Sequence, residues 1–512
     1  MSKHTPKVAY FCMEYALKSE IKTYAGGLGI LAGDYIKGAK DHDYPVIGIG
    51  IKWKQGYSEQ HIDKFGKPYD AYRNYSYDNL EDTGAVVYVK IRENNVGCKV
   101  WKVKELPLYL LDTDFSDNPD NWITGQLYGW FGEERIAQEM VLGIGGVRAL
   151  NALGIKPDVY HFNEGHAFFA GMELLRELME HGNCFDDALK KVRSKIVFTT
   201  HTPIVQGNES HPISRIIYMG ANIGLSIEQL VQIGGSPFNM TVAALRISKK
   251  SNAVAELHKE TANEMWKDYP NCSEIIGITN AIHIPTWVKS DMLKNVDNPS
   301  ALWEAHLKHK ESLIDFVQTR TGTLLNKNKL LIGFSRRAVA YKRSDLIFQD
   351  DAQLAPLLTE GKIQIIFSGK SHPLDDADYD MEIGAMLTSG SDVWLNNPRR
   401  PQEASGTSGM KAAMNGVLNC SILDGWWPEA CDHGVNGWQF GEGKGLNDFS
   451  PEELDNHDRR ALVEVLTKEV LPTYYNNNSK WIEMMQESIR STKEDFAIRR
   501  MLEEYFEYLY KA

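Results

Sequence analysis

The chain has 512 residues, which predicts about three domains at ~150 residues each and excludes a single small module. Its 56 Lys and Arg residues against 68 Asp and Glu residues give a net charge of −12, which argues against electrostatic binding of nucleic acid or anionic membranes. Apolar residues make up 43% and charged residues 24%, values typical of a globular protein, so disordered, fibrous and membrane classes are disfavoured.

The six cysteines are scattered and include no C-x-x-C pair, which favours free thiols in a reducing compartment over disulfides or a zinc–thiolate site. The N-terminal segment has no apolar stretch of the signal-peptide kind, and no run approaches the ~18 to 20 apolar residues of a membrane helix. We therefore expect a cytoplasmic protein that binds neither membranes nor nucleic acid.

Short apolar segments alternate with helical patterns along the chain. The predicted strands are 8–13, 45–51, 158–162, 195–201, 330–335, 364–370, 392–395 and 418–423. Between them, a segment such as 166–182 has apolar residues at three- and four-residue spacing, as expected of a crossover helix. This alternation predicts the α/β class, with two doubly wound, Rossmann-like domains that face each other across a cleft.

One long helix is predicted over 298–322, because Asn298-Pro299 is a helix start and Gly322 a helix stop. We place the domain junction just before it, which gives an N-terminal domain over 1–290 and a second domain over 291–475. The tail, 476–512, is predicted to be helical from Ser479 to the end and to pack back on the body. Its broad apolar face consists of Phe496, Met501, Leu502, Tyr505, Phe506 and Leu509.

Loops that follow the strands are candidate ligand sites, since open α/β sheets bind ligands at the carboxyl ends of their strands. Gly26, Gly27 and Gly29 follow the first strand and precede a helix, so their backbone N–H groups could approach a phosphate. For an isolated GGLG motif, a plain tight turn is the simpler interpretation.

A second loop, 336–343, has four cations in eight residues. Helical spacing would put Arg337 and Tyr341 on one face with Lys342 adjacent. Guanidinium and ammonium groups suit a small oxyanion, and positive charge at a helix start, which the helix dipole opposes, favours a functional role over a solvated face.

The third segment, 401–427, leads through small and hydroxylated residues into a predicted helix that carries Lys411. Small residues expose backbone N–H groups, and a lysine one turn into the helix can reach a cofactor held there. Because Met410, Ala412, Ala413 and Met414 surround it, we expect Lys411 to be buried, which is unusual for an unpaired lysine.

Four histidines lie near strand ends: His161, His166, His201 and His283. The motif HFNEGH lacks the spacing of a zinc site, so we predict no metal site and interpret most of these histidines as structural. We assign His201, between a strand and Thr-Pro, to the substrate. The glycines at 143–146 follow a helix rather than a strand, which indicates close helix packing and not a dinucleotide loop.

The segment EASGTSGMKAAMNG (403–416) resembles the pyridoxal-phosphate lysine segment of the glycogen, starch and maltodextrin phosphorylases, particularly their short bacterial and archaeal branch. Further family motifs are GGLG (26–29), HTP (201–203), TNAIHIPTW (279–287), RAVAYKR (337–343) and SGK (368–370). The resemblance runs from about residue 8 to about residue 440. It implies a GT-B glycosyltransferase fold and retaining, reversible transfer of glucose between an α-1,4-glucan end and orthophosphate, giving α-glucose 1-phosphate.

The resemblance also implies roles for individual residues. Lys411 would carry pyridoxal 5′-phosphate covalently, and Gly27, Arg336, Thr407 and Ser408 would contact phosphate of the cofactor. Arg337 and Lys342 would bind the substrate phosphate and, with His201, complete the catalytic group. Glu403, Ser405, Gly406, Asn280, Tyr341 and His166 would bind the sugar. The cofactor's phosphate would exchange the proton beside orthophosphate, since its second pKa lies near 6.

The sequence departs from the family at three places. Gly409 stands where longer members have Asn, and Val339 replaces a histidine, but neither change removes a required charge. The stretch 204–208 after HTP is unusual, which puts the acceptor subsite in question. The alternatives left open are a nucleotide-sugar-dependent glucan synthase, a catalytically inactive glucan-binding protein and a two-carboxylate hydrolase. The oligomeric state is also open, a homo-oligomer included.

Overall fold

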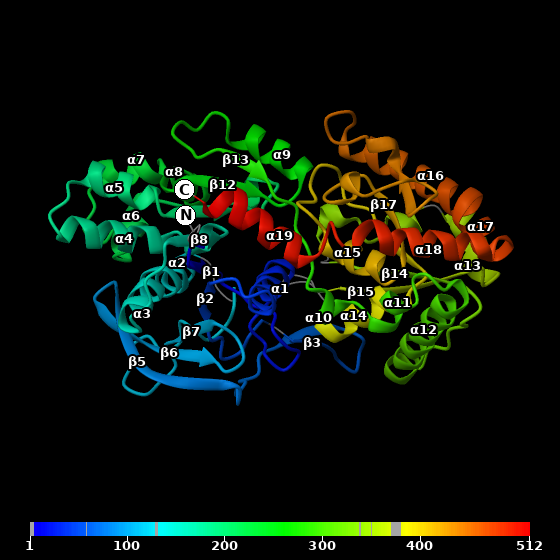
Figure 1. Cartoon of the computed structure of the whole chain (residues 1–512), viewed down its shortest axis with the longest axis horizontal. Coiled ribbons are helices and arrows are strands. Elements are labelled where there is room, and N and C mark those ends of the chain that lie inside the picture. Colours follow the sequence, from blue (N-terminus) through cyan, green and yellow to red (C-terminus); the bar gives the residue numbers. More distant parts are fainter. Residues whose placement is uncertain are drawn as a thin grey trace.

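The structure is a computed structural model and describes residues 5–57, 59–128, 132–336, 339–349, 351–369 and 380–511. Two mainly parallel sheets, each accompanied by helices, lie side by side along the longest axis of the molecule (Figure 1). The predicted α/β class is confirmed. We call the nine-stranded sheet with its helices the N-terminal half and the five-stranded sheet with its helices the C-terminal half.

The nine-stranded sheet has the order β13-β12-β9-β8-β1-β2-β7-β6-β5. Its strands are β1 (Val8–Phe11), β2 (Val46–Ile51), β5 (Leu80–Ile91), β6 (Asn94–Val103), β7 (Leu108–Asp112), β8 (Val159–Asn163), β9 (Ile196–Thr199), β12 (Lys250–Ala253) and β13 (Ile275–Gly277). β1 pairs in parallel with β2 and β8, so Tyr10 lies opposite both Gly48 and His161. The antiparallel edge β7-β6-β5 was not predicted, because β5 alternates buried and exposed residues instead of forming an apolar run.

Helices cover this sheet and position its loops. They are α1 (Gly27–Asp41), α2 (Glu133–Met140), α3 (Gly146–Ala152), α4 (Phe169–Glu180), α5 (Phe185–Arg193), α6 (Ile213–Tyr218), α7 (Ile227–Gly234), α8 (Met240–Ile247) and α9 (Glu256–Trp266). A π-helical turn, Val141–Gly145, joins α2 to α3. A Cβ at Gly143 would lie 2.4 Å from the backbone nitrogen of Ala170, which confirms close helix packing at these glycines.

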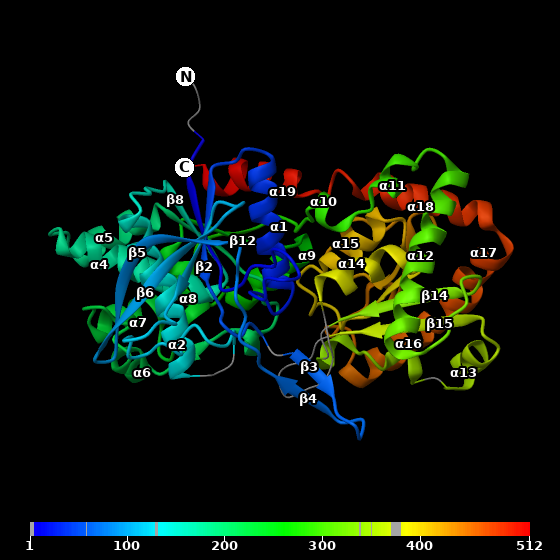
Figure 2. The same ribbon diagram turned by 90° about the horizontal axis from the view of Figure 1, so that it is seen from below.

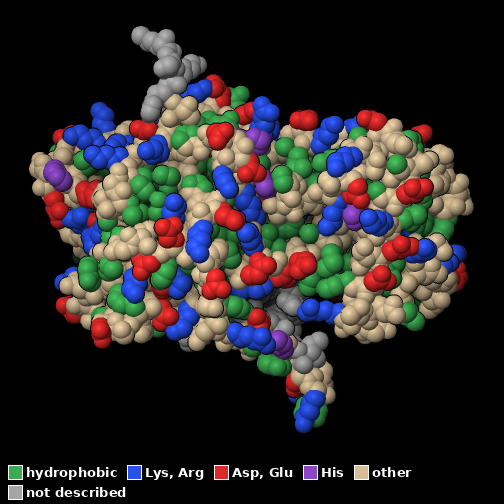
Figure 3. Space-filling model, turned by 60° about the horizontal axis from the view of Figure 1, so that its bottom comes forward, with side chains coloured by type: hydrophobic (Ala, Val, Ile, Leu, Met, Phe, Trp, Pro, Cys, Tyr) green, Lys and Arg blue, Asp and Glu red, His purple; other side chains and the backbone are tan. Residues whose placement is uncertain are grey.

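Two short strand pairs lie outside this sheet. They are β3 (Glu59–Ile62) with β4 (Pro68–Ala71), and β10 (Ser210–His211) with β11 (Phe238–Asn239). The β3–β4 hairpin projects from the body (Figure 2). Figure 3 shows acidic and basic side chains interspersed over one face of the molecule.

The C-terminal half has five parallel strands in the order β15-β14-β16-β17-β18. They are β14 (Leu330–Ser335), β15 (Ile363–Ser368), β16 (Val393–Asn396), β17 (Leu418–Ile422) and β18 (Gly437–Phe440). The accompanying helices are α10 (Ile284–Trp287), α11 (Ser290–Lys294), α12 (Pro299–Thr321), α13 (Asp351–Thr359), α14 (Met381–Gly390), α15 (Thr407–Met414), α16 (Pro451–Val465), α17 (Leu471–Asn476) and α18 (Asn478–Thr492). The predicted long helix is α12, which Asn298 caps by accepting from the N–H of Ala301 and Gly322 ends at φ 74°.

The sequence predicted one continuous helix for the C-terminal tail, and this prediction is wrong. The tail consists of α18 and α19 (Ile498–Glu504), followed by a π-helical turn, Tyr505–Tyr510. The chain turns between Lys493 and Ala497, so that α18 packs in the C-terminal half while α19 lies against α1 of the N-terminal half (Figure 1). The apolar residues of its predicted face are buried. The domain limits at 290 and 475 stay predictions.

A buried apolar cluster joins the two halves. It contains Ala16, Tyr24, Ile30, Ile282, Trp287, Val288, Met381, Met410, Ala413, Met414, Trp426, Trp427 and Phe496. Lys22 adds an ion pair to Asp380 of 2.8 Å. Among the described residues, no helix combines the length and the apolar character that a membrane span requires.

Candidate active site

A buried ion cluster lies beyond the carboxyl ends of β14 and β16. Arg336 follows β14 directly, and its guanidinium and the Lys342 ammonium both contact Oε2 of Glu403. The three side chains are each less than a tenth exposed. The backbone N–H of Glu403 donates to Asp424 at 2.9 Å, so a second carboxylate lies behind the first.

Burial and mutual charge shift the pKa values of this cluster. Burial, aided by Arg336, lowers the pKa of Lys342 to about 7, although Glu403 opposes the shift. Burial alone would raise the pKa of Glu403, but the two cations outweigh it, and the pKa lies below its usual value. Burial and the neighbouring Glu403 raise the pKa of Asp424 to about 7. Two cations thus converge on one oxyanion, an arrangement that also suits a phosphate.

Residues 339–343 do not form the α-helix that the sequence predicted. Val339 is extended, at φ −131° and ψ 147°, and a 3₁₀ turn covers Ala340–Lys342. Arg337 lies outside the described residues, so its spacing to Tyr341 stays a prediction. The Lys342 ammonium lies 4.6 Å from the centroid of the Tyr341 ring.

Arg343, the fourth cation of this segment, has a structural role. Its guanidinium pairs with Asp455 and Asp458 and donates to the carbonyls of Asn397 and Pro398. Because these four groups use its donors, Arg343 contributes nothing to the oxyanion site.

Lys411 lies on α15 and is buried, as its neighbours in the sequence predicted. Its Nζ is 3.3 Å from the centroid of the Trp287 ring, and Trp287 donates to the Asp34 carboxylate. Burial lowers the pKa of Lys411 to about 7, with Asp34 opposing the shift. The amine is therefore largely uncharged slightly above neutral pH, the state in which it acts as a nucleophile.

Residues at the starts of α1 and α15, the helices that carry Asp34 and Lys411, could hold a phosphate. Gly27 begins α1, so it lies in the helix rather than before it, and the space where its Cβ would stand is open within 4 Å. Ser408, in the first turn of α15, lies 3.4 Å from Nη1 of Arg336, and Thr407 begins that helix after Gly406 at φ 84°. Exposed N–H groups at a helix N-terminus, together with a guanidinium, are a phosphate-binding arrangement.

In the N-terminal half, His201 follows β9. Its Nε2 lies 2.6 Å from Oδ1 of Asn163, and its backbone N–H donates to Oε2 of Glu164 at 2.8 Å. Burial, with a contribution from His258, lowers the pKa of His201 to about 3, so the ring is neutral. A neutral ring with one nitrogen held by Asn163 can exchange hydrogen bonds with a sugar hydroxyl.

Glu164 was not predicted as a functional residue. Its backbone has φ 75° and ψ 167°, a conformation that is costly for residues other than glycine. Burial raises the pKa of its carboxyl to about 7, although hydrogen bonds from the backbone N–H of His201 and the hydroxyl of Thr202 lower it. Asp34 and Asp424 were also missed. Glu164, directly after β8, and Asp424, two residues after β17, stand at strand ends, where the sequence offered a signal.

Two predicted sugar-binding residues have free polar atoms within the part of the chain that the structure describes. Ser405 Oγ and Asn280 Oδ1 are buried without a hydrogen-bond partner, so each can bond to a ligand. His166 lies in the 3₁₀ turn Gly165–Ala167, and its Nε2 is 3.9 Å from Glu209. His161 and His283 have partners within the fold. The ring nitrogens of His161 contact Thr199 and Tyr510, and those of His283 contact Thr286 and Asp41.

The predicted site residues therefore fall into three groups. Arg336, Lys342, Glu403 and Ser408 are joined in the C-terminal half, Lys411 lies against Trp287 where the halves meet, and His166 and His201 belong to the N-terminal half.

Comparison with known proteins identifies relatives over nearly the whole chain. It is 38% identical to the maltodextrin phosphorylase of Thermococcus litoralis, over 98% of this chain and 70% of that protein. It is 33% identical to the glycogen phosphorylase of Aquifex aeolicus, over 98% of this chain and 86% of that protein. An uncharacterised protein of Methanocaldococcus jannaschii is 35% identical, over 98% of this chain and 99% of its own length. No model of a known family matches the chain.

Proposed function

The chain belongs to the family of maltodextrin and glycogen phosphorylases, and from this we propose how its own residues bind the cofactor and the substrates. It is an α-glucan phosphorylase, which transfers glucose reversibly between an α-glucan end and orthophosphate. The comparisons do not favour the glucan synthase or the inactive binding protein over this function.

Orthophosphate binds, in our proposal, at the cations that contact Glu403. Two phosphate groups ~4 Å apart repel by about 4 kcal/mol per charge pair at an effective dielectric constant of ~20, so cations must lie between or beside them. Arg336 and Lys342 supply two such cations, and we add Arg337 from the family resemblance. When phosphate enters, the two observed cations pass from the Glu403 carboxylate to the phosphate, which frees Glu403 for sugar hydroxyls.

The buried amine of Lys411 carries this proposal, since it is the group that would hold pyridoxal phosphate. Its lowered pKa keeps it nucleophilic, Trp287 excludes water from it, and Gly27, Thr407, Ser408 and Arg336 would hold the cofactor's phosphate. When bound, the cofactor supplies a phosphate whose second pKa near 6 allows proton exchange at neutral pH.

The glucose unit would be held by residues of both halves. Ser405 and Asn280 offer unpaired polar atoms, and the neutral His201 offers a ring nitrogen. Tyr341, Gly406 and His166 complete the proposed pocket. Because Asn163 holds Nε2 of His201, the remaining ring nitrogen has one defined role as donor or acceptor towards the sugar.

Borohydride reduction in the presence of pyridoxal phosphate, followed by peptide mapping, tests the cofactor assignment. We expect a pyridoxyl adduct on Lys411 and none in Lys411→Met. Lys37, a partly buried lysine whose charge acts on Lys411, is the competing amine, so Lys37→Gln should leave the adduct in place. An adduct on Lys37, or none on either lysine, would show that the assignment is wrong.

The substrate assignment is tested by phosphate release from glucose 1-phosphate with a panel of acceptors. We expect release with short maltodextrins and with glycogen. Equal release with unrelated sugars would contradict an α-glucan as the acceptor.

A further inference from the structure

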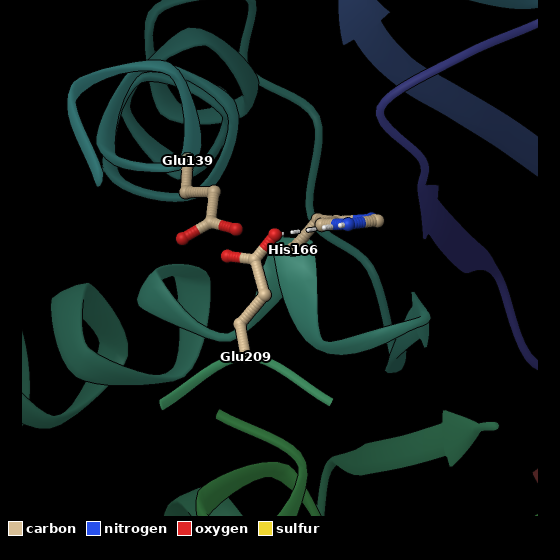
Figure 4. Close-up of side chains that lie close together, drawn as sticks. All are labelled: Glu139, His166 and Glu209. Carbon is tan, nitrogen blue, oxygen red and sulfur yellow. Dashed lines mark ion pairs between the residues drawn. The ribbon is translucent and has the colours of Figure 1, made fainter. Parts of the chain in front are cut away.

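Three side chains from separate segments converge in the N-terminal half (Figure 4). They are Glu139 on α2, His166 in the 3₁₀ turn after β8, and Glu209, eight residues after His201. Each offers one ligand atom, and the three atoms lie within 4.8 Å of one another. The sequence predicted no metal site, because neither HFNEGH nor any other local spacing unites these residues.

The cluster has unused ligand atoms. Glu139 is 0% exposed, and neither of its carboxylate oxygens has a hydrogen-bond partner among the described residues. Oε2 of Glu209 and Nδ1 of His166 likewise have none there. Leaving a buried carboxylate without a donor or a cation is costly, so this group calls for a partner.

There is room for such a partner. A cavity of about 80 Å³ is lined by Glu139, Glu164, His166, Thr202, Asn208 and Glu209, among others. This volume exceeds the ~30 Å³ that one water occupies in the liquid, so it can take an ion together with a water ligand.

The positive charge around the cluster is less than the negative charge of its carboxylates. Arg135 is the nearby cation, with Nη1 3.3 Å from Oε1 of Glu209 and its guanidinium over the Tyr128 ring. His211 approaches Oε2 of Glu209 to 3.6 Å, and Glu164 also faces the cavity. One guanidinium balances one carboxylate, so Glu139 requires either a proton or a share of a cation.

We propose that Glu139, His166 and Glu209 bind a divalent transition cation of the Mn²⁺ or Zn²⁺ class. Two carboxylates and an imidazole are ligands that these ions accept, whereas Mg²⁺ and Ca²⁺ prefer oxygen alone. Ligand atoms on opposite sides of an ion with bonds of ~2.1 Å are ~4.2 Å apart, so a separation of at most 4.8 Å needs only small side-chain rotations.

The bound cation would fasten the segment between His201 and Glu209 to α2. That segment contains the stretch 204–208, which departs from the family pattern. The site goes beyond the proposed function. It shares His166 with the proposed sugar pocket, but cation binding can be measured without the phosphorylase reaction, so the two proposals fail separately.

Direct cation binding tests the proposal. The full-length protein, loaded with pyridoxal phosphate and stripped with a chelator in phosphate-free buffer, is titrated with Mn²⁺ while free Mn²⁺ is followed by electron paramagnetic resonance. We expect one bound equivalent, displaced by Zn²⁺ but not by Mg²⁺. Glu139→Gln and Glu209→Gln should each weaken binding by about 100-fold or more, because loss of a ligand exceeds the 10- to 100-fold effect of outer partners.

Glu134→Gln is the matched control, since it removes a carboxylate from the same helix outside the cluster and should bind Mn²⁺ as the wild type does. Saturating Mn²⁺ should also raise the melting temperature of the wild type and of Glu134→Gln, but not of the two cluster variants. Glutamine is isosteric with glutamate, and circular dichroism before titration checks that each variant is folded. Absence of Mn²⁺ and Zn²⁺ binding to the wild type up to about 1 mM, the range of the weakest protein sites, would overturn the proposal in favour of a shared proton. Equal affinity in Glu139→Gln and Glu209→Gln would overturn it as well.

Discussion

The pKa of Lys411, lowered from 10.5 to about 7 by burial, ties this residue to the stability of the protein. Between pH 7 and 10.5 the unfolded chain binds a proton at Lys411 that the folded chain has released. This group therefore makes the unfolding free energy rise with pH in that window. We predict that cofactor-free Lys411→Met is more stable than cofactor-free wild type at pH 7.5. Its advantage should shrink by up to about 1.4 kcal/mol per pH unit towards pH 9.

Urea denaturation at pH 7.5, 8.25 and 9 measures this difference. Taking the difference between variant and wild type cancels the titration of other groups. Lys64→Met, at an exposed position of the β3–β4 hairpin, reports any general effect of replacing a lysine by methionine. A pH-independent difference for Lys411→Met would mean that the amine is not held in an apolar environment.

A substitution of Lys342 tests the proposed orthophosphate site. Removing its ammonium deletes one charge-assisted contact, worth about 1.5 to 3 kcal/mol, to the proposed phosphate. We predict that Lys342→Met raises KM for orthophosphate about 10- to 100-fold in initial-rate phosphorolysis. Lys444→Met, at an exposed position of the same half, should behave as the wild type. An unchanged KM in Lys342→Met would place the phosphate elsewhere.

At the scale of elements, α1 offers a matched pair of glycines. A Cβ at Gly33 would lie 1.9 Å from the carbonyl oxygen of Ala16, whereas the corresponding space at Gly27 is open. Gly33→Ala gains up to about 1 kcal/mol of helix propensity but forces the backbone apart, so we predict a net destabilisation of about 2 kcal/mol or more in urea denaturation. Gly27→Ala should leave stability within about 0.5 kcal/mol of the wild type.

Gly27→Ala is expected to affect cofactor binding rather than stability. The methyl group of Gly27→Ala would occupy the space that we assign to the cofactor's phosphate, so fluorescence titration should show weaker binding of pyridoxal phosphate than in the wild type. Binding equal to that of the wild type would remove Gly27 from the cofactor site.

The elements that the sequence predicted well have signals within one segment. Asn298 and Gly322 bound α12 because capping is a local interaction, and the buried parallel strands appear as apolar runs. The β7-β6-β5 edge was missed because a half-exposed strand such as β5 has few consecutive apolar residues. Over the described residues 339–343, a 3₁₀ turn stands in place of the expected α-helix, because Arg343, which ends the turn, is held by tertiary contacts with Asp455 and Asp458.

The same distinction applies to the candidate site. Lys411 could be predicted because its apolar neighbours in the sequence are also its surroundings in the fold. Glu164 and Asp424 stand after strands, but their raised pKa values could not be predicted, since these depend on burial and on contacts with His201 and Glu403, more than twenty residues away. The ion pairs of Glu403 with Arg336 and Lys342 likewise span more than sixty residues and have no local pattern.

At the scale of the whole molecule, the contacts made where the tail crosses between the halves determine whether the two halves unfold together. Phe496 lies at this crossing: its carbonyl accepts from the N–H of Ile282, and its ring packs edge-on against Trp426 with centroids 4.8 Å apart. It is 4% exposed within the apolar cluster that joins the halves. This contact gives the two halves a shared core, so the wild type should unfold in one calorimetric transition with van't Hoff and calorimetric enthalpies that agree.

We predict that Phe496→Ala destabilises the protein by about 3 to 5 kcal/mol, the usual range for a buried phenylalanine, and separates the calorimetric trace into two transitions. The truncation weakens the contact between the halves while leaving the core of each sheet intact, so the weaker half can unfold first. Tyr508→Ala controls for a change elsewhere in the tail, because Tyr508 is 55% exposed, and should keep one transition. If Phe496→Ala melted in one transition at a lower temperature, the coupling between the halves would have to rest on the remainder of the cluster and on the Lys22–Asp380 ion pair instead.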